Sequence, residues 1–95
     1  MSVTVYIPTP FRRVTNNQSR VESAPTIVSE LLDDLESSYP GLKGLVRDES
    51  GTVHGHINLY VNNEAIDGLD GLATRLKDGD ELSIIPALAG GGAWS

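Results

Sequence analysis

The sequence predicts an α+β domain in which one main helix covers one face of a mixed sheet of four or five strands. Segments at both ends of the chain alternate apolar, mostly β-branched residues with polar ones, a pattern typical of half-buried strands. One segment between them places apolar residues at helical spacing. With only 95 residues, these elements must share a single hydrophobic core.

The strands are expected in the order β-β-α-β-(β)-β. The first covers residues 2–8 and forms a hairpin with a short strand at residues 19–23, through a polar turn. In the second half, residues 57–61 form a strand and residues 64–66 a strand stub, joined by a tight turn at Asn62 and Asn63. Residues 81–86 form the last strand.

The main helix is expected at about residues 26–38. Thr26 can cap its first turn through the side-chain hydroxyl, and Tyr39-Pro40-Gly41 ends it. Leu42, Leu45 and Val46 are expected to add one further turn at the end of the core. The predicted core consists of apolar residues on the inner faces of these elements: Val3, Val5, Ile7, Ile27, Leu31, Leu35, Leu59, Val61, Leu82 and Ile84.

Composition and charge narrow the function. Seven basic and thirteen acidic residues give a net charge of −6, which should repel phosphate backbones and suits docking onto a basic protein surface, so no nucleic-acid partner is expected. No apolar run reaches the roughly 18 residues of a membrane span. The absence of cysteine excludes disulfides and thiol catalysis. With no evident secretory signal at the start, we expect a cytoplasmic protein.

Neither a metal site nor a catalytic site is expected. His54 and His56 are two residues apart and could share one face of an extended segment, but no carboxylate pattern completes a metal site. The acidic residues at 33, 34 and 36 are interpreted as the solvated face of the helix. No histidine or pocket pattern supports paired-carboxylate catalysis there.

The C-terminal segment is the most informative part of the chain. After Pro86 the sequence continues through Gly90-Gly91-Gly92 to Ser95, and consecutive glycines favour no fixed structure. We expect a folded domain at residues 1–88 and a flexible tail at residues 89–95. Such a tail is either a frayed terminus or a segment without side chains that threads a narrow channel and brings a carboxylate to ATP.

Six motifs, taken together in order and spacing, resemble one known family. They are VTVYIPT from Val3, DLE from Asp34, YVNNE from Tyr60, GLAT from Gly71, DGD from Asp78 and IIPALAGG from Ile84. The chain resembles the ubiquitin-like sulfur carriers of the ThiS/MoaD superfamily, and most closely the CysO-type carriers. This resemblance implies a β-grasp fold and a carrier function.

In that family an enzyme of the ubiquitin-activating type uses ATP and Mg²⁺ to adenylate the C-terminal Gly-Gly carboxylate, and sulfur then replaces AMP to give a thiocarboxylate. ATP and Mg²⁺ belong to the partner, so the resemblance implies a chain that binds no cofactor and is not an enzyme. The sulfur acceptor implied is a metabolic enzyme such as a cysteine synthase. Molybdopterin, thiamine and secondary-metabolite synthesis are the alternatives.

This chain continues past Gly91 with Gly92-Ala93-Trp94-Ser95. The resemblance therefore implies a precursor that a JAMM-type zinc metalloprotease trims. Spacing from Pro86 places the mature end at Gly91, preceded by Gly90, and cleavage after Gly92 is the alternative. An expression artefact is a third explanation of the extension.

An apolar patch beside the tail is the expected docking surface for the adenylating enzyme. Ile85 and Leu88 are expected near the tail, and Pro8 and Tyr60 join them on the sheet.

Two further functions stay open beside the sulfur carrier. One is a protein modifier conjugated to lysines, and the other is a plain binding module on the same scaffold.

Overall fold

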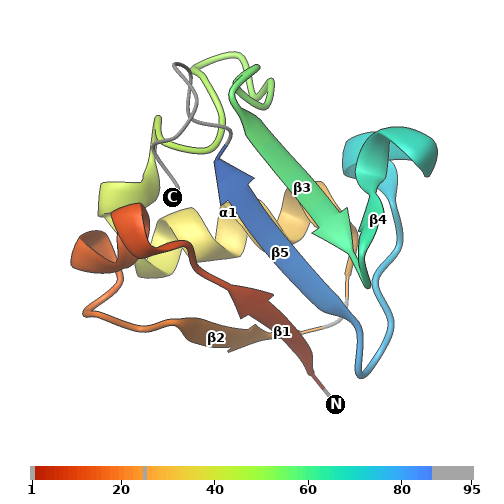
Figure 1. Ribbon diagram of the computed structural model, residues 1–95, viewed down its shortest axis with the longest axis horizontal. Coiled ribbons are helices and arrows are strands. Elements are labelled where there is room, and N and C mark those ends of the chain that lie inside the picture. Colours follow the sequence, from red (N-terminus) through yellow and green to blue (C-terminus); the bar gives the residue numbers. More distant parts are fainter. Residues whose placement is uncertain (1, 25, 87–95) are drawn as a thin grey trace, which may run out of the picture.

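Five strands form one mixed sheet in the order β2-β1-β5-β3-β4 (Figure 1). The structure is a computed structural model that describes residues 2–24 and 26–86. The expected order of elements and the mixed sheet with one main helix are confirmed. The strands are β1 (Val3–Tyr6), β2 (Arg20–Ser23), β3 (Ile57–Val61), β4 (Glu64–Ala65) and β5 (Glu81–Pro86).

The first and last strands of the domain lie side by side at the centre of the sheet. β1 and β5 run parallel, with Val5 beside Leu82, whereas all other neighbouring strands are antiparallel. The backbone N–H of Gly79 donates to the Ser2 carbonyl at 2.8 Å, which fixes the start of both strands. The carboxyl ends of β1 and β5 therefore meet at the same edge of the sheet.

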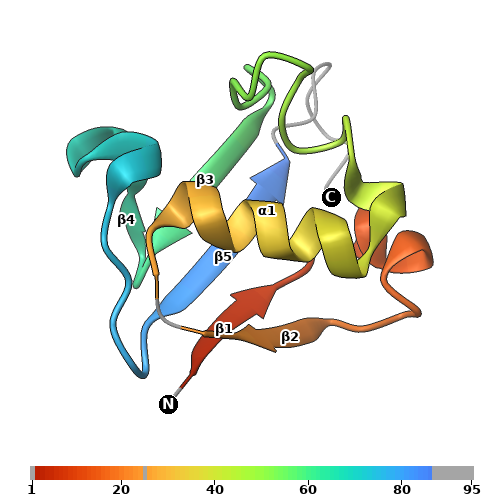
Figure 2. The ribbon, with the colours of Figure 1, turned by 180° about the vertical axis from the view of Figure 1, so that it is seen from behind.

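Helix α1 (Val28–Ser38) crosses one face of this sheet (Figure 2) and leaves the other face, which is turned toward the viewer in Figure 1, open. Its buried residues are Val28, Leu31, Leu32 and Leu35. Every residue of the predicted core is buried except Ile27, which is half-buried. Ile27 precedes the helix and forms an isolated β-bridge with Arg75, so Val28 takes the inward position instead.

The predicted cap at Thr26 is also wrong. No side chain caps the start of α1, and the Thr26 hydroxyl donates to the Glu30 carboxylate. The N–H group of Val28 is bonded to the Thr74 carbonyl at 3.0 Å. A distant backbone segment thus supplies the acceptor that a local hydroxyl was expected to supply.

Short 3₁₀ helices close the ends of the core. The helix η1 (Thr9–Val14) was not predicted; Pro8, where the first strand was expected to end, is its N-cap, and the helix packs Phe11 and Val14 against the core. The expected turn after α1 is the 3₁₀ helix η2 (Pro40–Leu42), with Leu42 and Val46 buried. Two more, η3 (Ile66–Gly68) and η4 (Gly71–Ala73), follow β4, so Ile66 begins a helix and does not extend the strand stub.

Paired asparagines form two of the turns. Asn62 and Asn63 have φ values of 51° and 72°, and together they turn β3 into β4 as predicted. Asn16 and Asn17 adopt the same left-handed conformation between η1 and β2. Asparagine tolerates this region better than most residues, which explains its use at both turns.

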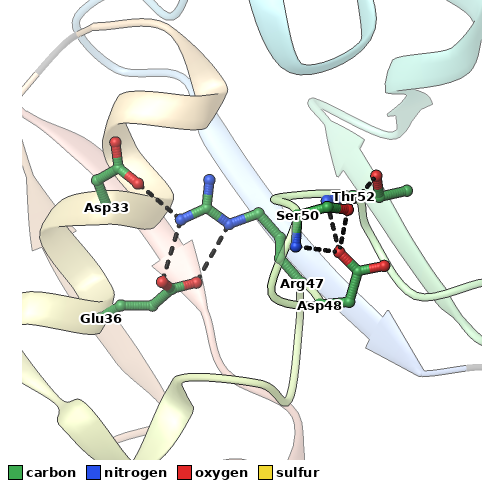
Figure 3. A network of polar contacts seen from close by, with 6 residues as sticks. All are labelled: Asp33, Glu36, Arg47, Asp48, Ser50 and Thr52. Carbon is green, nitrogen blue, oxygen red and sulfur yellow. Dashed lines mark hydrogen bonds and ion pairs between the residues drawn. The ribbon is translucent and has the colours of Figure 1, made fainter.

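The buried side chain of Arg47 links the long loop between η2 and β3 to helix α1 through ion pairs (Figure 3). Nη2 of Arg47 lies 2.7 Å from the Asp33 carboxylate and 3.1 Å from the Glu36 carboxylate. Burial alone would lower the pKa of Arg47, but hydrogen bonds and attraction from the two carboxylates outweigh it and raise the pKa above the usual value. Asp33 and Glu36 are therefore ion-pair partners of Arg47. They do not serve only as part of the solvated face of the helix, which was the interpretation from the sequence.

Beyond Arg47, the chain turns back on itself. Oδ1 of Asp48 accepts hydrogen bonds from the Ser50 N–H, the Ser50 hydroxyl and the Thr52 N–H, at 2.7–3.0 Å (Figure 3). These bonds hold the pKa of Asp48 below its usual value. Arg47 and Val53 form a β-bridge at the base of this turn, so the ion pairs anchor a preorganised loop.

Replacing Arg47 should destabilise the domain. We expect Arg47→Ala to lower the free energy of unfolding by about 1–3 kcal/mol, less than the loss for a fully buried pair, because the largely exposed Asp33 can be rehydrated. Urea denaturation measures the change. The control is Arg13→Ala, since Arg13 is exposed and its loss should stay within about 0.5 kcal/mol. Equal losses in both variants would contradict the anchoring role.

Candidate functional site: the open face of the sheet

The face of the sheet opposite α1 presents a row of polar and aromatic side chains. Tyr6 of β1 and Tyr60 of β3 are both Cα partners of Ser83 on the central strand β5. All three are half-buried, because the strands alternate between core and open face. The parallel pairing of β1 with β5 therefore builds a continuous row, Tyr6-Ser83-Tyr60, across three strands.

Ile85 lies one step further along β5 on the same face. With 43% of its surface exposed, it is one of two large exposed hydrophobic residues among those described, the other being Leu69 at 37%. The side chains of Ile85 and Pro8 line a shallow groove of about 360 Å³ between the end of β5 and the start of η1. The structure thus brings together two of the four predicted docking residues.

The other predicted positions are placed differently. Tyr60 shares the open face with Ile85, but it lies in the neighbouring row and does not line the groove. Leu88 and the glycines Gly90, Gly91 and Gly92 lie outside the described residues, as does the predicted domain boundary after residue 88.

Two polar residues of this groove, Arg12 and Ser83, are among those that the sequence analysis did not assign to the site. Arg12 lines the groove, and its Nε donates to the Ile7 carbonyl at 3.1 Å, which holds the side chain beside β1. Ser83 contributes from β5. No periodic signal marks Arg12, because it lies in the unpredicted helix η1. The outward position of Ser83 followed from alternation, but its neighbours depend on strand pairing.

The opposite end of β5 is held by an aspartate and an asparagine. The Asp80 carboxylate accepts from the Lys77 N–H at 2.7 Å and from the Asn62 amide at 2.9 Å, and these bonds lower the pKa of Asp80. Asn62 Oδ1 in turn accepts from the N–H of Glu81 at 3.0 Å. Asp80 is therefore an ionised structural group that fixes where β5 begins.

The two histidines form a stacked pair away from the open-face groove. The ring centroids of His54 and His56 are 5.2 Å apart, and His54 Nε2 lies 2.8 Å from the Gly44 carbonyl oxygen.

Across residues 2–24 and 26–86, no group of three or more potential metal ligands is found. No helix in the same part of the chain is long and apolar enough to cross a membrane.

Comparison with known proteins assigns this arrangement to a family. The model of the ThiS family matches residues 5–91. The sulfur carrier protein CysO of Mycobacterium tuberculosis is 41% identical over 93 residues, covering 96% of this chain and 100% of CysO. The small archaeal modifier protein 3 of Haloferax volcanii is 42% identical, over 85% of this chain and 89% of that protein.

A solved structure gives the same result for the fold. The Amycolatopsis orientalis BexX/CysO complex contains a chain with a TM-score of 0.86 and 44% identity, covering 94% of this chain and 99% of that chain. The expected family resemblance and the expected fold are therefore confirmed. The chain belongs to the ThiS family and has the β-grasp fold of its CysO relatives.

Proposed function

We propose that this chain is a sulfur carrier whose C-terminal glycine is adenylated and then converted to a thiocarboxylate. The observation that best supports this proposal is that the family match ends at residue 91, within the Gly-Gly-Gly segment. Residue 91 is also the mature end expected from the spacing after Pro86. The similarity to CysO over nearly the whole chain supports the carrier function.

The chemistry needs two steps. The carboxylate oxygen attacks the α-phosphorus of ATP, pyrophosphate leaves, and an acyl-adenylate forms. Sulfide then attacks the acyl carbon and expels AMP, so that sulfur replaces one carboxylate oxygen. A free carboxylate resists sulfur nucleophiles, whereas its mixed anhydride with AMP has a good leaving group. These steps use no side chain of this protein, so we propose no enzymatic role for it.

The proposed partners follow from these steps. An adenylating enzyme of the ubiquitin-activating type supplies ATP, Mg²⁺ and the catalytic groups. A JAMM-type metalloprotease exposes Gly91, since a peptide-bonded glycine has no carboxylate to activate. The proposed sulfur acceptor is a cysteine-synthase-type enzyme, because the CysO relatives match over nearly the whole chain. The open-face groove at the end of β5 is the proposed docking surface for the adenylating enzyme.

A protein modifier is the second candidate function. The observation that favours it is the 42% identity to the small archaeal modifier protein 3. Both functions share the acyl-adenylate, and they differ in what attacks it. A lysine adduct on another protein identifies a modifier, and a mass gain of about 16 Da at the C-terminus identifies a sulfur carrier.

The extension should block the chemistry. The 95-residue chain continues past Gly91 through the bulky Trp94 to Ser95. We expect no mass gain when it is incubated with the cognate adenylating enzyme, ATP and sulfide. Removing Gly92–Ser95 should allow a gain of about 16 Da, and Gly91→Leu in the shortened chain should abolish it, because a side chain clashes where bare backbone is needed. The same gain on untrimmed protein would refute the precursor role.

Docking should depend on Ile85. We expect Ile85→Asp in the chain ending at Gly91 to raise the KM for the carrier in adenylation by about tenfold or more, because an unpaired carboxylate is costly to bury in an apolar contact. The matched control is Leu69→Asp at the other exposed hydrophobic position, which should leave KM within about twofold. Circular dichroism confirms that both variants fold. A normal KM for Ile85→Asp would place the docking surface elsewhere.

A further inference from the structure

Charge is distributed unevenly along the chain. Residues 1–21 contain three of the seven basic residues, Arg12, Arg13 and Arg20, and none of the thirteen acidic ones. The rest of the sequence therefore holds four basic and all thirteen acidic residues, a net charge of −9, and the whole chain has a net charge of −6. A partner that meets the N-terminal segment meets a basic surface on a protein that is acidic overall.

Strand pairing places acidic and basic residues in different rows across the open face. In one row across the sheet, Glu22 and Glu81 flank Thr4. In the next row, nearer the carboxyl end of β5, Arg20 and Ser83 flank Tyr6. The open face is thus acidic at the end where β5 begins and basic at the end where it stops.

Arg12 strengthens the basic end. It lines the same groove as Tyr6 and Ile85, and the bond to the Ile7 carbonyl uses only its Nε. Arg13 and Arg20 are exposed, and no ion pair joins any of these three arginines to a carboxylate in the described part of the chain. The acidic end is reinforced by the turn that precedes β5, which carries Asp80. The guanidinium groups therefore remain available to a partner.

We propose that this charge separation orients the carrier on its adenylating enzyme, with Arg12 and Arg20 against an acidic rim around the channel that receives the tail. The inference rests on the proposed function, since it needs a partner that takes the tail. Opposite charges at two ends of one face favour a single docking direction, because the reversed direction places like charges together.

The phosphates of ATP are not the partner of these arginines. Gly91 lies five positions after Pro86, and a fully extended chain of that length spans at most roughly 17 Å. A carboxylate delivered through a channel therefore reacts well beyond the reach of side chains around the groove. The acidic groups must belong to the enzyme's surface near the channel mouth.

The test is a charge reversal with a matched control. Arg20→Glu and Arg75→Glu change the net charge equally, and both positions are exposed, but Arg75 lies on the segment between η4 and β5 that pairs with Ile27. Arg20→Gln, which removes the charge without reversing it, keeps the test valid if the reversal disturbs β2. Each chain ends at Gly91, and pyrophosphate release by the cognate adenylating enzyme gives KM and kcat.

We expect Arg20→Glu to raise the KM for the carrier about tenfold at low ionic strength and less than about threefold at 0.5 M salt, where screening is strong. Arg20→Gln should show a smaller rise, while kcat should stay within about twofold in all variants. Arg75→Glu should leave KM within about twofold.

Equal KM values for Arg20→Glu and Arg75→Glu, a lower KM for Arg20→Glu, or an effect that salt does not weaken would overturn the orientation proposal while wild-type adenylation stays intact. Failure of the wild-type chain to release pyrophosphate would instead refute the proposed function, and the orientation proposal with it.

Discussion

The parallel pairing of β1 with β5 is the constraint on which the rest of the structure depends. It brings the two ends of the folded domain together at the centre of the sheet and sets Val5 against Leu82 in the core. Parallel strands carry their carboxyl ends to one edge, so η1 and the point where the tail leaves β5 become neighbours. A chain that reversed this pairing would keep its hydrophobic pattern and lose the groove of Pro8, Arg12 and Ile85.

Strand and helix positions could be predicted because burial imposes periodicity on the residues themselves. The alternation that buries Val3 and Val5 also turns Tyr6 outward. The start of α1 could not be predicted in the same way, because its first N–H is satisfied by Thr74, 46 residues away in the chain. The residues around a group do not indicate a hydrogen-bond partner so far away in the sequence. The same holds for the ion pair between Arg47 and Asp33.

In the candidate site too, some residues could be predicted from local sequence patterns and others only from the fold. Ile85 could be assigned to a docking patch because it faces outward on the last strand, Pro8 was expected to join it on the sheet, and the structure places both in one groove. Arg12 could not, since only the fold of η1 brings it to them. Net charge predicted a basic partner, yet the open face is basic toward the carboxyl end of β5, because strand register places Arg20 there and η1 places Arg12 in the groove. Local charge, not the total, faces the partner during docking.

The central claim is that the open face at the carboxyl end of β5 delivers the tail to its enzyme. NMR mapping tests it most directly, with the ¹⁵N-labelled chain ending at Gly91 titrated with the unlabelled adenylating enzyme. Amide signals of Tyr6, Ser83 and Ile85 should shift or broaden first, and those of Glu30 and Asp34 on the exposed side of α1 should not. Changes confined to α1, with the open face unaffected, would contradict the account.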